Sequence, residues 1–102
     1  MNELWKDIKG FEGYQVSSQG NIRNKLGKIL SPYQNKKGYL KVGLFKDGKL
    51  YKKRINRLVA EAFIDNPNHL PFVRYKNGDK CDNSVINIEW GNQNYYLDKK
   101  LN

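Results

Sequence analysis

The feature that most constrains the fold of this chain is an alternating stretch at residues 38–45, followed by the turn-forming pair Asp47-Gly48. An alternation of period two is typical of a β-strand with one apolar face. Asp-Gly pairs favour the positive backbone angles of a tight hairpin turn, and residues 50–55 then resume as the return strand. The sequence therefore predicts an antiparallel hairpin whose inner face carries Leu40, Val42 and Leu44.

A helix is predicted directly after the hairpin. Asn56 has a side chain that can cap the first turn of a helix, and Asn66-Pro67 is a pair at which a helix ends. Apolar residues between these two points recur at the spacing of one helix face. The predicted helix therefore runs from Asn56 to residue 63 or 64, with an apolar side that consists of Leu58, Val59, Ala62 and Phe63.

The remaining segments predict short strands and a second compact unit. Residues 5–24 combine closely spaced apolar residues with glycines, as short strands joined by tight turns do. Residues 72–75 and 85–90 have the character of apolar strands on either side of a polar loop, and we expect a final helix to start at Asn92. The predicted fold class is α+β: a small N-terminal antiparallel β-sheet and hairpin module with a helix, followed by a second small unit.

The length of 102 residues is that of one domain, so we expect a single compact domain over residues 1–102. Hydrophobic residues make up only 38% of the chain, and aromatic side chains therefore have to supply much of the buried area. We expect the core to contain Trp5, Phe11, Tyr14, Phe63, Phe72 and Trp90.

Charge and cysteine content narrow the partners and the compartment. Nineteen Lys and Arg residues against ten Asp and Glu residues give a net charge of +9, which favours a polyanionic partner or an acidic protein face. No apolar run approaches the ~18 residues of a membrane span, so no membrane partner is expected. The acidic residues Glu3 and Asp7 argue against an N-terminal targeting peptide, and the single cysteine, Cys81, fits a reducing compartment. We expect a cytoplasmic protein.

Three stretches carry a resemblance to one family. Residues 5–23 contain the runs G-F-E-G-Y, V-S and G-N-I-R, residues 57–67 read R-L-V-A-E-A-F-I-D-N-P, and residues 73–90 read V-R-Y-K-N-G-D-K-C-D-N-S-V-I-N-I-E-W. The first resembles the NUMOD-class motif at the front of phage- and intron-borne HNH homing endonucleases, and the other two resemble their nuclease half. The resemblance implies a NUMOD-like segment at residues 1–35 and an HNH-like segment at residues 36–102. The NUMOD-class matches are Trp5, Ile8, Gly10, Phe11, Gly13, Tyr14, Val16, Ser17, Gly20, Ile22 and Arg23.

The resemblance implies a ββα unit that holds one divalent metal and uses a His as general base to cleave a phosphodiester. Family members usually read V-N-H or V-D-H where this chain has Val73, Arg74 and Tyr75. A guanidinium cannot ligate a metal, and a phenol with a pKa near 10 is a poor base at neutral pH. The HNH-like unit is therefore expected to be catalytically degenerate, with no metal and no other cofactor.

Other positions of the resemblance complete the comparison. Asn87 matches the central Asn, whose family role is to tie the loop behind the base. The last metal ligand of the family falls at Tyr96, and Asn94 could replace it only if the register shifted by two. Asn56 stands where the family commonly has a His. Relatives often continue into a helical DNA-reading segment, and because the sequence ends at Asn102 we expect little base discrimination.

An active site rebuilt from other groups is the alternative to lost catalysis. His69 is the only imidazole, and it lies in a predicted loop where an exposed, non-catalytic role is the ordinary one. Asp79 and Asp82 lie in a polar loop that lacks the central Gly and closing Glu of an EF-hand, so we expect them to bond turns rather than a cation.

Basic residues gather in the predicted hairpin and around Arg74. A surface of this kind binds phosphates, because Arg offers a bidentate fork and Lys a point charge, whereas the alternative is a solvated basic face. The candidate nucleic-acid contacts are Lys36, Lys37, Lys41, Lys52, Lys53, Arg54, Arg57, Arg74 and Lys76.

The sequence thus favours a phage-type, HNH endonuclease-like protein that has lost the catalytic metal centre and binds DNA without cutting it. One alternative is a phage-encoded inhibitor that binds a host protein, either a defence nuclease or a transcription enzyme. A second alternative is an active nickase or endonuclease, which would need a divalent metal. In each case the resemblance implies the cytoplasm of a bacterial host cell.

Overall fold

The structure, a computed structural model, describes residues 2–92. It begins with a three-stranded antiparallel sheet whose strands occur in chain order. These strands are β1 (Trp5–Asp7), β2 (Gln15–Ser17) and β3 (Ile22–Arg23). The Arg23 guanidinium lies 4.0 Å from the ring centre of Trp5, and it donates two hydrogen bonds to Gln15 Oε1 at 2.9 and 2.7 Å. Residues of the N-terminal motif therefore stabilise this sheet.

The predicted hairpin is confirmed as the centre of a second sheet. This sheet has the order β4-β5-β6, with β4 at Tyr33–Gln34, β5 at Leu40–Lys46 and β6 at Lys49–Arg54. Asp47 and Gly48 form the turn with φ angles of 52° and 78°, as the Asp-Gly pair predicts. Val42 and Leu44 are buried at 2% and 0% exposure, which confirms the inner face.

Helix α1 (Ile55–Phe63) follows β6 without a loop. The prediction that Asn56 caps this helix is wrong, because the N-cap residue is Arg54 and Asn56 lies inside the first turn, where only 3% of it is exposed. The helix ends at Ile64, whose N–H donates to the Ala60 carbonyl, so the predicted end is confirmed. Among the described helices, none is long and apolar enough to cross a membrane.

The C-terminal unit pairs β7 (Phe72–Tyr75) with β8 (Ile88–Gly91) in an antiparallel ribbon. The first strand has the predicted bounds. The prediction of one strand over residues 85–90 is wrong in its first half, because Val85–Asn87 forms a short 3₁₀ helix, η1. The predicted helix from Asn92 lies outside the described residues.

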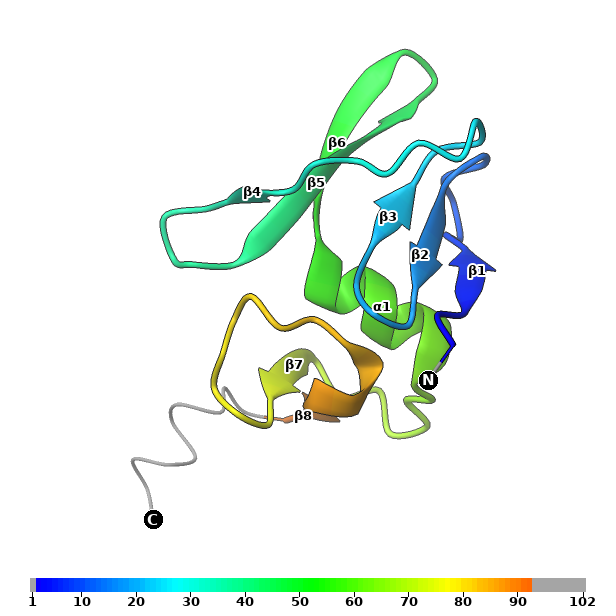
Figure 1. Cartoon of the computed structure of the whole chain (residues 1–102). Coiled ribbons are helices and arrows are strands. Elements are labelled where there is room, and N and C mark those ends of the chain that lie inside the picture. The colour runs from blue at the N-terminus through cyan, green and yellow to red at the C-terminus, as the bar shows by residue number, and fades with distance from the viewer. Residues whose placement is uncertain (1, 93–102) are drawn as a thin grey trace.

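The core lies where α1 meets the sheets, with the helix in the middle of the molecule (Figure 1). Its buried side chains are mostly aliphatic, and the predicted core aromatics Phe11, Tyr14, Phe63 and Trp90 pack around them only partly buried. The prediction is wrong for Trp5, which is half-buried in the N-terminal sheet away from this core, and for Phe72, which is 46% exposed. Phe72 is the first residue of β7, which pairs only with β8, so no third strand of this sheet lies beside it. The α+β prediction is confirmed. The buried hydrophobic residues are Ile8, Val16, Ile22, Val42, Leu44, Ile55, Leu58, Val59, Ala60, Tyr75 and Ile88.

Candidate nucleic-acid interface

The hairpin presents a basic face opposite its buried one. Residues paired across an antiparallel ladder project from the same face, and so do residues two apart along a strand. Lys41 pairs with Arg54, and Gly43 pairs with Lys52. We define the outer hairpin face as Lys41, Gly43, Phe45, Leu50, Lys52 and Arg54. It carries three cations and no carboxylate.

A cleft with a volume of about 320 Å³ lies between β6, the start of α1 and the loop after β1. Six cationic side chains and a single carboxylate, that of Glu61, line it. Positive charges that converge in one concave site raise the local potential and attract anions. We call this site the basic cleft. Its cations are Lys9, Lys41, Lys52, Lys53, Arg54 and Arg57. Five of the nine nucleic-acid contacts predicted from the sequence thus line the basic cleft, together with Lys9, which was not predicted.

Lys9 was missed by the sequence analysis because it is far from the hairpin along the chain. Lys9 precedes Phe11 by two residues in the chain, and both side chains line the basic cleft. The Phe11 ring packs edge-on against Tyr51 at 5.5 Å between ring centres, and Lys53 Nζ lies 5.3 Å from the same ring. The aromatic contact holds the N-terminal loop against β6, and no local sequence signal reports it.

Arg54 connects the basic cleft to the centre of the C-terminal unit. Its guanidinium lies 4.2 Å from the ring centre of Tyr39, and Tyr39 lies 6.3 Å from the ring of Tyr75. Lys80 Nζ approaches the Tyr39 ring at 4.7 Å and donates to the Lys37 carbonyl at 2.8 Å. The turn before β5 and the loop after β7 are thereby joined.

Three of the predicted contacts lie away from the basic cleft. Lys36 and Lys37 are exposed in the turn between β4 and β5, and Lys76 is exposed directly after β7. The Lys76 side chain is available to solvent, while its backbone N–H donates to the Asn87 carbonyl at 2.7 Å.

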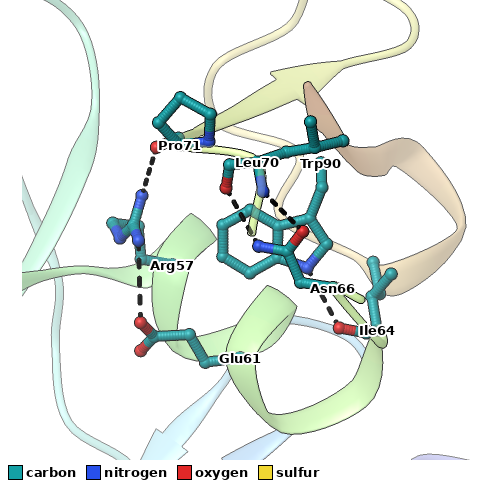
Figure 2. A network of polar contacts seen from close by, with 7 residues as sticks. All are labelled: Arg57, Glu61, Ile64, Asn66, Leu70, Pro71 and Trp90. Atoms are coloured by element: carbon teal, nitrogen blue, oxygen red, sulfur yellow. Dashed lines mark hydrogen bonds and ion pairs between the residues drawn. The ribbon is translucent and has the colours of Figure 1, made fainter. Parts of the chain in front are cut away.

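Arg57 has a structural role beside its place in the basic cleft (Figure 2). It donates to the Pro71 carbonyl at 2.9 Å, lies 3.7 Å from the Glu61 carboxylate, and lies 5.2 Å from the ring centre of Trp90. Trp90 Nε1 donates to the Ile64 carbonyl at the end of α1, at 3.0 Å. These contacts tie α1 to both strands of the C-terminal ribbon.

Tyr75 occupies the position at which the sequence comparison expects a general base. Only 6% of it is exposed, and its hydroxyl donates to Asn83 Oδ1 at 2.6 Å. Burial raises the pKa of the Tyr75 phenol well above its usual value, and the hydrogen bond from the Asn56 amide lowers it by less. Asn56 and Tyr75, the two positions at which the resemblance leads one to expect histidines, thus lie together. A neutral, buried phenol of this kind accepts no proton from water at neutral pH.

Arg74 lies next to Tyr75 on β7 and forms an ion pair across the ribbon. Its Nη2 is 2.9 Å from Glu89 Oε2, and these two residues are direct partners in the β7–β8 ladder. The ion pair offsets part of the charge that Arg74 would bring to a phosphate. Tyr96, the fourth position of the expected centre, lies outside the described residues.

Asn87 ties the loop at residues 77–83 from inside. Its Nδ2 donates to Asn77 Oδ1 and to the Asp82 carbonyl, both at 2.9 Å, and its Oδ1 accepts the Asn77 N–H at 3.2 Å. Only 7% of Asn87 is exposed. One carboxamide therefore closes the loop behind Tyr75.

The described residues at this centre do not fit a divalent metal. Arg74 is a cation, and the Tyr75 hydroxyl is neutral and already donates to Asn83. Within residues 2–92, no three His, Cys, Asp or Glu side chains come together as a metal-binding group. His69 is exposed in a loop, with φ at 52°, and Asp79 and Asp82 accept hydrogen bonds from Cys81 and Ser84 of their own loop.

Comparison with known proteins finds one motif model and relatives of one kind. The NUMOD4 motif model matches residues 3–45. The DNA endonuclease I-HmuI of Bacillus phage SP01 is 39% identical over 99 residues, which are 95% of this chain and 57% of that protein. An uncharacterised HNH endonuclease of Acanthamoeba polyphaga mimivirus is 45% identical over 95 residues, 87% of this chain and 24% of the relative.

The solved structure of the HNH homing endonuclease I-HmuI, which describes DNA binding and cleavage by that enzyme, matches with a TM-score of 0.80 at 39% identity. The match covers 96% of this chain and 56% of the other. The chain therefore spans about half the length of the phage relative and, as the mimivirus match shows, about a quarter of the viral one.

Proposed function

Because this chain is a homologue of HNH homing endonucleases and carries their NUMOD4 motif, we propose that it binds duplex DNA without cutting it. The single observation that carries the proposal is the convergence of six cations on the basic cleft, next to a centre where a buried phenol stands in place of a base. We assign the function to the cytoplasm of a bacterial cell, where phage and host DNA are accessible.

Binding should depend mainly on phosphate contacts. The outer hairpin face and the basic cleft offer Lys and Arg side chains but few polar groups that could read base edges. Phosphate contacts position a protein on DNA without selecting a sequence, and each of them releases counterions. The proposed complex therefore forms on many sequences and weakens steeply as salt increases.

The absence of cleavage follows from the chemistry at Arg74 and Tyr75. Hydrolysis of a phosphodiester in this family's manner needs a base that takes a proton from water and a cation-binding pair of ligands. The Tyr75 phenol is held in its neutral form by burial, and the Arg74 guanidinium repels a cation. Neither group can serve in the role that its position has in the family.

A binding series against salt tests the DNA-binding half of the proposal. We expect the logarithm of the association constant to fall linearly with the logarithm of salt concentration, and replacement of two cations by Lys41→Gln and Lys52→Gln should reduce the slope by about 1 to 2. Lys28→Gln, an exposed Lys in the turn after β3, is the matched control and should leave the slope unchanged. A wild-type affinity without salt dependence would remove the proposal.

Incubation of supercoiled plasmid with Mg²⁺ or Mn²⁺ tests the other half. We expect no nicking by the wild-type protein. The triple substitution Arg74→Asn, Tyr75→His and Tyr96→Asn supplies the family's residue types and is the positive control, since nicking gained there shows that the scaffold still supports the reaction. Nicking by the wild type that is lost in Tyr75→Phe or in His69→Ala would instead establish an active nickase.

The alternative function is that of an inhibitor that binds a host protein. A pull-down from bacterial lysate, done before and after nuclease digestion, distinguishes this alternative from DNA binding. DNA binding predicts that co-purified material disappears with the nucleic acid. A defence nuclease or transcription enzyme retained after digestion would replace DNA as the partner.

A further inference from the structure

An apolar pair interrupts the positive charge of the outer hairpin face near its tip. Phe45 and Leu50 are direct cross-strand partners, and 61% and 50% of their surfaces are exposed. Lys52, two residues after Leu50, projects from the same face, whereas the next pair toward the turn, Lys46 with Lys49, projects from the opposite one. Two large apolar side chains exposed side by side make an apolar patch on this face, outside the core.

On the basis of the DNA-binding function proposed above, we propose that Phe45 and Leu50 form a wedge that inserts between base pairs of duplex DNA from a groove. Proteins that bend DNA use apolar side chains in this way, partly unstacking a base step while cations hold the neighbouring phosphates. The hairpin supplies both kinds of contact on one face.

The backbone holds the pair in position. A Cβ atom on Gly43 would lie 2.8 Å from Leu50 Cδ1, so the Leu50 side chain lies directly over this glycine. The Phe45 N–H donates to the Tyr14 hydroxyl at 3.1 Å, which attaches β5 to the N-terminal sheet at this point. A wedge that is already ordered loses little freedom on binding.

The charge around Phe45 and Leu50 indicates which kind of partner binds there. The cations that share the face of this pair, Lys41, Lys52 and Arg54, favour a polyanion over an uncharged protein patch. Stacked bases are the apolar surface that duplex DNA offers between its phosphates. A wedge bordered by cations therefore fits DNA in both its parts.

The double variant Phe45→Thr, Leu50→Thr tests the wedge, because Thr keeps a high strand propensity while it removes the apolar surface. The salt series separates the two contributions: phosphate contacts set the slope, and contacts with bases set the affinity that remains at high salt. We expect the double variant to bind about tenfold more weakly at every salt concentration with an unchanged slope. Leu26→Thr, which replaces a side chain that is 87% exposed in the N-terminal module, is the control and should bind like wild type.

A second measurement reports on unstacking directly and requires no known target sequence. Nicked plasmid is ligated in the presence of the protein, and the change in linking number is read on a gel. Wild type and Leu26→Thr should unwind the plasmid, whereas the double variant should not, at concentrations where each is fully bound.

The outcomes distinguish the wedge from the binding function itself. If wild type binds with the expected slope and the double variant matches it in affinity and in unwinding, the wedge is refuted and DNA binding stands. If wild type does not bind DNA, the proposed function fails and the wedge with it. Circular dichroism of each variant establishes that the fold is kept.

Discussion

Tyr75 shows how one side chain defines the chemistry of the centre. In place of an imidazole that could exchange a proton near neutral pH, it supplies a phenol held between two carboxamides, those of Asn83 and Asn56. Burial favours the neutral phenol, and the hydrogen bond to Asn83 satisfies a buried acceptor. The group therefore contributes to the stability of the fold.

Removing the Tyr75 hydroxyl should destabilise the fold. In Tyr75→Phe the buried Asn83 Oδ1 loses its donor, and an unsatisfied buried acceptor costs about 1–3 kcal/mol. Urea unfolding measures the loss, and Tyr33→Phe, which alters a tyrosine that is 41% exposed, should change the free energy of unfolding by less than about 0.5 kcal/mol. Equal stability of the two variants would contradict the importance of the Tyr75–Asn83 bond.

The same phenol predicts a pH dependence. Its folded pKa is raised above the unfolded value near 10, so the stabilisation is complete below about pH 10 and declines as pH rises, because only the unfolded chain ionises there. Wild type should lose up to about 1.4 kcal/mol per pH unit more than Tyr75→Phe in this range. Urea unfolding of both proteins from pH 8 to pH 11 checks this, and parallel curves would count against the raised pKa.

The Asn66 side chain closes the turn between α1 and β7 (Figure 2). Asn66 Oδ1 accepts the Leu70 N–H at 2.8 Å, and Asn66 Nδ2 donates to the Leu70 carbonyl at 2.9 Å. Two hydrogen bonds from one amide thus close the turn that directs the chain from the helix into the ribbon. Together with Trp90 and Arg57, they fix β7 relative to the basic cleft.

Asn66→Ala should therefore lower the free energy of unfolding by about 1–2 kcal/mol, since two part-buried backbone groups lose their partner. Asn68→Ala, in the same loop but exposed, is the matched control and should be close to neutral. Denaturant unfolding of the pair is the measurement. A neutral Asn66→Ala would mean that the turn is set by its backbone alone.

Across the whole molecule, the N-terminal sheet is attached to the C-terminal unit at Gly20. A Cβ atom there would come within 3.1 Å of Asn83 Cβ and 3.2 Å of the Asn83 carbonyl oxygen. The Ser18 carbonyl accepts the Val85 N–H at 2.8 Å beside this contact. Asn83 also receives the Tyr75 hydroxyl, so the contact reaches the centre of the second unit.

Gly20→Ala and Gly27→Ala separate packing from backbone strain. Both glycines have positive φ, +89° and +83°, and an alanine pays about 1 kcal/mol or more at such angles. A Cβ on Gly27 meets nothing within 4 Å, whereas one on Gly20 presses on Asn83. Gly20→Ala should therefore destabilise by about 1–2 kcal/mol more than Gly27→Ala in thermal or urea unfolding. Equal losses of unfolding free energy in the two variants would show that Asn83 can move aside for a Cβ atom at Gly20 at little cost.

Local patterns predicted the elements whose cause is local. The hairpin follows from alternation and an Asp-Gly turn, and β7 from a short apolar run, so both have their predicted positions. Long-range contacts set the rest. Asn56 is buried beside Tyr75 instead of capping α1, and Lys9 reaches the basic cleft through the Phe11–Tyr51 contact. No pattern in the sequence around Asn56 or Lys9 predicts these contacts.

The closure of residues 77–83 by the Asn87 carboxamide has an evolutionary consequence. Because the hydrogen bonds of Asn87 lie outside positions 74 and 75, this part of the loop's closure does not depend on which residues occupy those two positions. A scaffold closed in this way can accept different side chains at positions 74 and 75 over evolutionary time while the loop behind them stays tied to Asn87.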